Sequence, residues 1–247
     1  MSFSIIKSLS IKQIGICLLI FTIMGIGCKV DSAKTAEIKQ NLTEQVNKEV
    51  EKISDLTTDT EIAKSFFDPP HDGELTLISR DDGQYDTPYD IKYTDPSGKV
   101  WTAPKGTITD GASIPEKLSS IFGGKLNPTH LNAAIVHDAY CGIANKGQAN
   151  YCKETWQNTH RMFYQACLKN GKDKLSAGTM YAGVRLGGPR WDENGSPLPG
   201  LEKVGAEAMT KAVLDCKAWL VSKGGFVSLD ELETYLDKVE AELLQAS

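Results

Sequence analysis

The sequence has little of what marks nucleic-acid-binding proteins, zinc fingers or repeat proteins. Its 27 Lys and Arg are outnumbered by 32 Asp and Glu, which gives a net charge of −5, and no basic stripe follows the N-terminus. This balance argues against nucleic acid as a main partner. None of the six cysteines stands at Cys-x-x-Cys spacing, which argues against a common zinc site. We find no internal repeat, so a repeat array is not expected.

The sequence also lacks an apolar run long enough for a comfortable membrane span. Its N-terminal run, Ile14–Ile26, follows two lysines and is shorter than the roughly 20 residues that a spanning helix needs. We therefore predict a signal peptide over residues 1–27. The run ends in Gly-Ile-Gly before Cys28, which resembles a bacterial lipobox, although Gly25 stands where Leu is usual. The resemblance implies cleavage before Cys28 and lipid on its sulfur; the alternatives are an uncleaved anchor and an ordinary signal peptide.

A lipid on Cys28 implies a location in the bacterial cell envelope. Lys29 follows the cysteine, which favours the outer membrane in a cell that has one, with the domain facing the periplasm or the extracellular surface. The expected partners are the membrane, through the lipid, and an envelope or phage component. No pattern fixes an oligomeric state. Apolar residues at helical spacing within Asp31–Asp55 predict an amphipathic tether over residues 28–68.

Strand-like and then helical patterns follow the tether. A turn at Asp95–Gly98 joins two alternating segments, Tyr89–Tyr93 and Val100–Ala103, which predicts a hairpin. Residues 69–191 are expected to form the core domain and residues 192–247 a C-terminal helical extension. We predict an α+β fold, mostly α, with a small antiparallel hairpin or sheet followed by a bundle of about five helices. The helices are expected at Asn127–Cys141, Gln148–Lys169, Lys174–Leu186, Leu201–Val221 and Leu229–Leu244.

Four cysteines remain beyond the signal peptide and Cys28, an even number in an oxidising compartment, which indicates disulfides. They are Cys141, Cys152, Cys167 and Cys216. Three pairings are open. A bond between Cys141 and Cys152 is geometrically easy, because they lie at the end of one predicted helix and near the start of the next. Cys167 and Cys216 would then form the second bond.

The helix at Asn127–Cys141 carries the clearest candidate site. Asn127 and Pro128 are a typical helix start, and the middle of the helix is small and apolar. His137 and Asp138 stand in its last turns, beside Tyr140. Two titratable groups in so apolar a helix point to a site.

The order of motifs is familiar. The stretches VWTAPKGTITDGASIP and AAIVHDAY are followed by a helix with Phe163 and a helix around Met180–Arg185. This order resembles the phage-associated domain-of-unknown-function family 1353 over Gly73–Trp191. The family implies no activity. One departure is that the second helix of the family typically carries an Asp three residues before the aromatic residue, where this chain has His160.

A looser resemblance is to the helix pair of calcium-dependent secreted phospholipases. It implies that His137 is a general base and Asp138 a calcium ligand, with carbonyls near Asp110–Ala112 completing the site. His160 stands where that analogy needs an orienting Asp. A His-Asp metal phosphohydrolase is disfavoured because His130 would lie about 10.5 Å away along the helix.

Neighbouring helical residues point about 100° apart, so Asp138 does not orient His137. A base at His137 needs a partner from elsewhere in the fold. The candidates are Asp110, Ser113, His160 and Tyr181. Asp110 is the preferred one, either as the orienting group or, together with Asp138, as a tentative calcium ligand. The alternative is a structural pair that fixes the Thr109–Pro115 loop on the helix.

These patterns predict a lipid-anchored envelope protein with a binding or accessory role. Its His-Asp site would be of structural or degenerate catalytic origin. The alternative is an envelope hydrolase acting on a lipid or cell-wall ester or amide. It would use His137 as general base, with Asp138 and Asp110 as metal ligands or orienting groups. An accessible His137 favours the hydrolase, and a fully buried one with only internal hydrogen bonds excludes it.

Overall fold

The structure is a computed structural model that describes residues 40–41, 43–45, 62–68, 75–112, 122–225 and 227–246. The strands and long helices described below lie in a compact unit, Thr58–Ser247. The predicted signal peptide, Cys28, most of the tether and Ser113 lie outside the described residues. The predicted domain boundaries therefore stay predictions. Among the described residues, no helix combines the length and apolar character needed to cross a bilayer.

Two small antiparallel sheets precede the long helices. The first has the order β1-β4-β5 and consists of Phe66–Asp68, Ile91–Thr94 and Val100–Ala103. The second has the order β2-β3-β6 and consists of Ile78–Ser79, Tyr85–Asp86 and Ile108–Thr109. β4 and β5 form the predicted hairpin, with Tyr93 opposite Trp101. Its turn is held by Asp95, whose carboxylate accepts bonds from two backbone N–H groups of the turn and from Trp101 Nε1.

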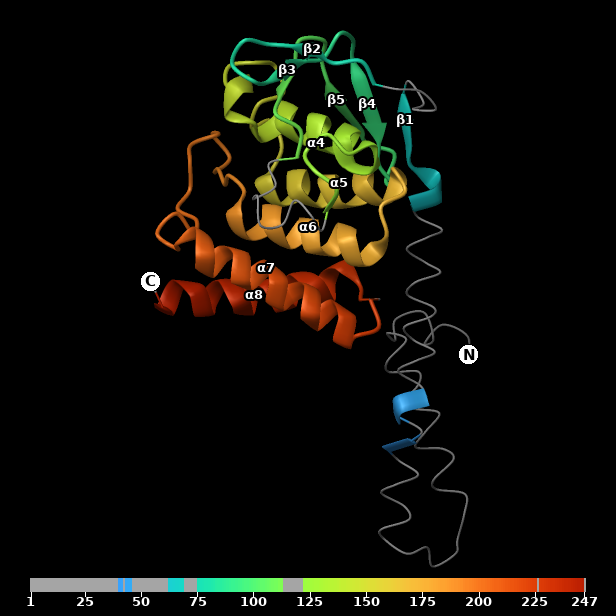
Figure 1. The fold of residues 1–247 in the computed structure, drawn as a ribbon, viewed down its shortest axis with the longest axis vertical. Helices are drawn as coiled ribbons and strands as arrows, with labels where there is room; N and C mark the ends of the chain where they lie inside the picture. The colour runs from blue at the N-terminus through green and yellow to red at the C-terminus, as the bar shows by residue number, and fades with distance from the viewer. Residues whose placement is uncertain are drawn as a thin grey trace, which may run out of the picture. The chain divides into compact units, whose positions relative to one another are not determined.

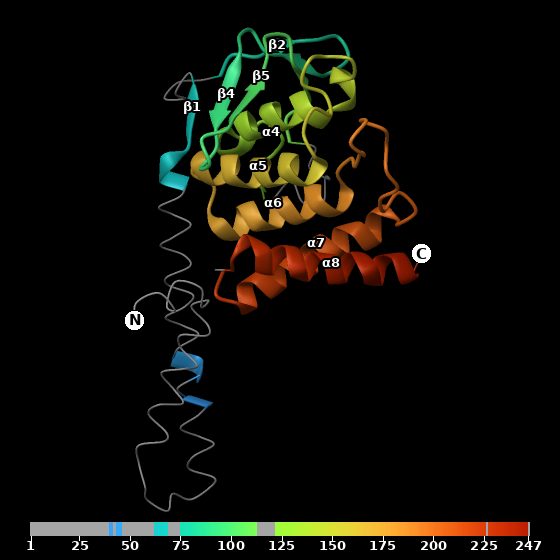
Figure 2. The same cartoon turned by 180° about the vertical axis from the view of Figure 1, so that it is seen from behind.

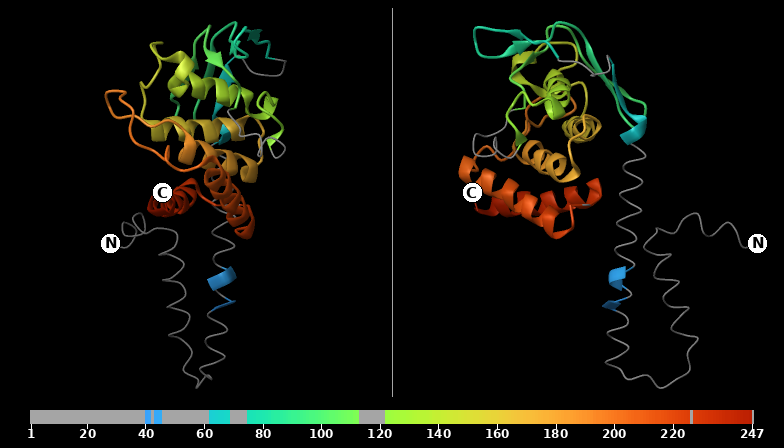
Figure 3. Two further views of the ribbon diagram at one scale, coloured as in Figure 1. Left: turned by 60° about the vertical axis from the view of Figure 1, so that its left-hand side comes forward. Right: turned by 45° about the vertical axis from the view of Figure 1, so that its right-hand side comes forward.

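The helices stack away from the strands in sequence order. Figures 1 and 2 show the strands at one end of the unit, α4 beneath them, then α5 and α6, and α7 and α8 at the far end. The turned views of Figure 3 show the same order. The predicted α+β, mostly α fold is confirmed. The bounds are α4 Pro128–Cys141, η2 Ile143–Asn145, α5 Trp156–Lys169, α6 Lys174–Gly187, α7 Ala206–Ser222 and α8 Leu229–Ala246.

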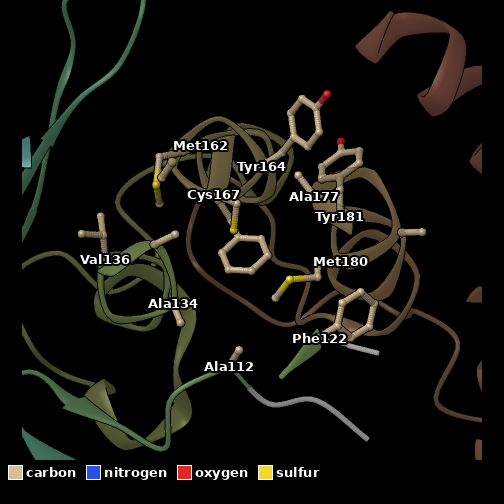
Figure 4. Packing of buried hydrophobic residues seen from close by; sticks show 14 of the residues in the cluster. Ala112, Phe122, Ala134, Val136, Met162, Tyr164, Cys167, Ala177, Met180 and Tyr181 are labelled. Carbon is tan, nitrogen blue, oxygen red and sulfur yellow. The ribbon is translucent and has the colours of Figure 1, made fainter. Parts of the chain in front are cut away.

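The core lies where α4, α5 and α6 meet. Figure 4 shows Val136 of α4 and Met162 of α5 on one side of this core, and Met180 and Tyr181 of α6 on the other, with Cys167 between them. Side chains of this size contribute about 1.5–3 kcal/mol each on burial, so this three-helix contact is a main source of stability.

α5 begins at Trp156 rather than at the predicted Gln148. The cause is local capping: the hydroxyl of Thr155 accepts a hydrogen bond from the N–H of Asn158 at 3.2 Å, which fixes the helix start there. The preceding residues form turns, and the N–H of Cys152 bonds the carbonyl of Tyr140 at 2.8 Å.

The predicted disulfides are not present, since Cys141, Cys152, Cys167 and Cys216 all carry free thiols. Cys167 on α5 and Cys216 on α7 belong to helices between which α6 lies (Figure 1). Cys141 is close to Cys152, but its thiol points back along α4 and donates to the carbonyl of His137 at 3.3 Å. Neither of the two suggested disulfides is therefore present, because spacing along the chain does not fix the direction of a thiol.

His130, near the start of α4, predicts an acid sensitivity. Its ring is completely buried, its Nε2 donates to the carbonyl of Gly124 at 3.0 Å, and burial lowers its pKa from 6.5 to about 4. Below pH 6.5 the unfolded chain therefore binds a proton that the folded chain accepts only near pH 4, and stability falls over this window. We expect His130→Gln to remove up to about 3 kcal/mol of this pH-dependent loss. Chemical denaturation of both proteins at pH 7 and pH 4.5 measures the difference, and equal losses in the two would contradict the assignment.

Candidate functional site

α4 positions the site because it is buried on all sides. Asn127 caps it by accepting a bond from the N–H of Thr129 at 2.9 Å, and Pro128 occupies the first turn, as the sequence predicts. Contacts with β5 and β6 cover one face and contacts with α5 cover another. A helix enclosed in this way reads as apolar all round, so each polar side chain on it requires an internal partner.

Asp138 faces the strand side, where Thr109 of β6 meets it. The Thr109 hydroxyl donates to Asp138 Oδ2 at 2.6 Å and accepts from the N–H of Gly111 at 2.9 Å. Burial raises the pKa of Asp138 to about 8, with a smaller contribution from the charge on Asp110 and against the hydrogen bond from Thr109, which lowers the pKa. The carboxyl group thus ties the loop after β6 to the helix.

Asn145 of η2 completes this contact. Its amide donates to the carbonyl oxygens of Asp138 and Ile108 at 2.9 and 2.7 Å, and its side-chain oxygen accepts from the N–H of Ile108 at 2.8 Å. It is fully buried. This role was not predicted, because a lone Asn in a connector looks like an ordinary turn residue.

His137 faces the opposite side, towards α5. Its Nε2 lies 2.9 Å from Nδ1 of His160, and the Cys141 thiol lies 3.4 Å from both of its ring nitrogens. The three residues are buried, and His137 is the most exposed of them at 8%. His160 was one of four candidate partners, and it is the one that meets His137. Cys141 was expected in a disulfide and instead joins this group.

Burial controls the protonation of all three groups. It lowers the pKa of His137 to about 4. It also holds the pKa of His160 well below 6.5, an effect that the neighbouring His137 reinforces. The pKa of the Cys141 thiol is raised well above its usual value, first by burial and then by the charges of Asp138 and Cys152. At neutral pH the site therefore holds two neutral imidazoles and a protonated thiol.

Aromatic side chains enclose the two histidines. The ring of Phe163 lies 5.2 Å from that of His137, and the rings of Trp156 and Trp191 lie 5.7 and 6.4 Å from that of His160. Arg185 and Arg190 each stack 4.7 Å above the Trp156 ring. This apolar wall keeps water from the imidazoles and explains their low pKa values.

The other predicted site residues lie elsewhere. The Tyr140 hydroxyl accepts from the N–H of Thr102 at 3.3 Å. Tyr181 donates to Glu233 Oε1 at 2.6 Å, away from His137. Asp110 forms an ion pair with Lys125 at 2.7 Å and lines an open hollow of about 590 Å³ at the start of α4. The tentative calcium site at Asp110 and Asp138 stays a prediction; the contacts seen for the two carboxylates are with Lys125 and Thr109.

The central part of the chain also matches known sequences. Residues 87–184 match the family described as "Protein of unknown function (DUF1353)". The family resemblance predicted from the motifs is confirmed over these residues. The matched segment contains Asp110, His137, Asp138, Cys141 and His160.

Two uncharacterized proteins of Sinorhizobium fredii (strain NBRC 101917 / NGR234), y4jT and y4iH, are each 37% identical to this chain over 102 residues, or 41% of its length. The aligned segment covers 28% of y4jT and 39% of y4iH, so each relative has most of its length outside the likeness. The comparison with solved structures found no match. Neither the DUF1353 description nor these names assigns a biochemical role.

The Asp138 contact within the DUF1353 segment is testable by removing one hydroxyl. Thr109→Val leaves the Asp138 carboxyl and the N–H of Gly111 without their shared partner, so we expect a loss of about 1–3 kcal/mol in the free energy of unfolding. Thr179→Val is the matched control, because that buried hydroxyl bonds only the carbonyl of Leu175 one turn earlier and its loss costs less. Urea denaturation compares the two, and equal losses would show that Thr109 does not support Asp138.

Proposed function

We propose that this chain is a lipid-anchored protein of the bacterial envelope that binds an envelope component and has no hydrolase activity of its own. The observation that carries the proposal is the direction of His137, whose ring nitrogens face His160 and Cys141 inside the protein. A general base must reach the proton that it removes from a water or substrate. The buried ring of His137 does not offer that access.

The neighbouring groups also lack the properties of a catalytic set. A nucleophilic cysteine is exposed and has a lowered pKa, whereas Cys141 is 4% exposed and its pKa is raised by burial. The group that meets His137 is a second imidazole of low pKa, where a base is usually oriented by a carboxylate or carbonyl. The Asp138 carboxyl accepts its bond from Thr109. These contacts favour a structural pair over a hydrolase.

The hollow at the start of α4 supports a binding role. Its volume of about 590 Å³ is in the range of small-molecule sites. Asp110 and Lys125 place one charge of each sign on its wall, beside Tyr85 and Leu126. A mixed wall of this kind fits a ligand with both polar and apolar parts.

The proposed anchor rests on the sequence pattern that ends at Cys28. Because the cysteine sulfur is the acceptor of the lipid, Cys28→Ser should abolish incorporation of an alkyne-labelled fatty acid into the full chain in cells. It should also move the protein from the membrane to the soluble fraction. Cys17→Ser, within the same N-terminal segment, is the control and should keep the label. Labelling that survives Cys28→Ser would contradict the anchor.

The binding role is tested by placing a photo-crosslinking amino acid in the full chain in cells. At Leu126, which is 40% exposed on the wall of the hollow, we expect a discrete adduct with an envelope component. At Val221, which is 56% exposed on α7 at the far end of the unit, we expect none. Asp110→Ala should weaken the Leu126 adduct, because it removes a charge from the wall.

An activity assay of the purified protein tests the alternative function, an envelope hydrolase. Purified wild type and His137→Gln are compared on ester substrates, phospholipid vesicles and cell-wall fragments. The proposal expects no turnover above background in either. Turnover by the wild type that is lost in a folded His137→Gln variant would overturn it.

A further inference from the structure

We propose that His137, Cys141 and His160 bind a single thiophilic transition-metal ion, Zn²⁺ in the first instance; the neighbouring Cys152 becomes a fourth ligand only if its side chain moves, because its sulfur lies outside this group of donors. Each of the first three residues offers one donor atom, and these atoms all lie within 4.8 Å of one another. No other cluster of three His, Cys, Asp or Glu residues that could hold a metal is found in the part of the chain that the structure describes. The site goes beyond the proposed binding role and does not depend on it.

The spacing of the donors fits a tetrahedral ion. Bonds of about 2.0 Å to nitrogen and 2.3 Å to sulfur place neighbouring donors roughly 3.3–3.6 Å apart in such a site. The Cys141 sulfur lies 3.4 Å from the nitrogens of His137, and the two imidazole nitrogens are 2.9 Å apart. An ion therefore requires the imidazoles to separate by a few tenths of an ångström. It also requires the Cys141 side chain to turn, because its sulfur lies over the His137 ring, equally far from both nitrogens.

The secondary structure already fixes these donors. His137 and Cys141 stand four residues apart on α4, which puts them on one face of the helix. His160 reaches them from α5, the helix that packs against α4. A site built on two packed helices is held more rigidly than one on loops.

The second nitrogen of His160 faces the backbone just after α6, near the carbonyl of Pro189, which favours a proton on that nitrogen with or without a metal. Its Nε2 is buried and forms no hydrogen bond of normal geometry, and it lies against the backbone at Gly188, where a Cβ atom would come within 2.9 Å of it. A metal on Nδ1 fixes the proton on Nε2, which then points at this backbone turn. Metal-bound histidines commonly use their second nitrogen in this way.

Cys152 lies next to Cys141, although its sulfur is not among the donors that lie within 4.8 Å of one another. It packs against Cys141, Trp156 and Trp191, and its N–H bonds the carbonyl of Tyr140, which holds it next to Cys141. Its φ of +53° lies in the left-handed region, an uncommon conformation for a residue other than glycine. Two thiols and two imidazoles form a donor set typical of structural zinc.

The charge balance is simple. Each thiol that binds Zn²⁺ exchanges its proton for the metal and releases that proton to solvent; nothing is oxidised or reduced. The imidazoles bind in their neutral form. The cations beside the site are Arg185 and Arg190, and both form ion pairs with α8. Arg185 pairs with Asp237 and Glu240, and Arg190 pairs with Glu240.

The test uses the full chain, purified in detergent with a reductant and stripped with a chelator. After addition of Zn²⁺ and dialysis, we expect one zinc per chain. The X-ray absorption spectrum of the zinc-loaded wild type should show imidazole nitrogens and at least one sulfur, and two sulfurs if Cys152 is a ligand. With Co²⁺ as the probe, we expect a thiolate-to-cobalt charge-transfer band. Loss of bound metal on dialysis, or a zinc shell without sulfur, would overturn the proposal.

Variants locate the ion. Cys141→Ser and His160→Gln should each lower the zinc affinity at least tenfold and weaken the cobalt band. The controls are His130→Gln, a buried histidine on the same helix, and Cys216→Ser, a buried thiol on α7; both should keep the wild-type stoichiometry. Equal loss in controls and site variants would overturn the assignment. If the site variants fail to fold, the sulfur content of the wild-type zinc shell still decides.

Discussion

The enclosure of α4 is the constraint on which the rest of the unit depends. A helix with strands on one face and α5 on another has no water to satisfy its polar groups. Three of its titratable residues, His130, His137 and Asp138, each meet a specific partner from another segment: the carbonyl of Gly124, the ring of His160 and the hydroxyl of Thr109. Because each partner lies on a different segment, these contacts fix the register of the helix against its neighbours.

The two adjacent residues of the His-Asp motif consequently contact different parts of the protein. Since adjacent helical side chains diverge by about 100°, Asp138 points to β6 and His137 points to α5. The first holds a loop through Thr109, and the second joins a buried cluster with Cys141. A motif that looks like one catalytic pair in the sequence is thus two contacts on opposite faces of one helix. This division is also why a metal at His137 would not involve Asp138.

Local signals in the sequence predicted much of this fold. The Asn127 cap, the β4–β5 hairpin and the helical character of the C-terminal half follow from short-range patterns. The meeting of His137 with His160 did not follow, because it depends on how α4 and α5 pack, and the start of α5 was placed eight residues early. The cysteines show the same limit: Cys141 was predicted in a disulfide, yet its thiol direction is set by the end of α4. The roles of Asn145 and Lys125 depend on tertiary contacts that no spacing encodes.

The wall around His160 extends past the segment that matches DUF1353. That match ends at residue 184, whereas Arg185, Arg190 and Trp191 follow it. The two arginines stack on Trp156, which in turn contacts His160, and both are held by Glu240 of α8. Because a guanidinium over an indole is strengthened when both are shielded from water, removal of α8 would loosen Trp156 before it affected α4. The C-terminal helices are therefore part of the environment that keeps the imidazole pair dry.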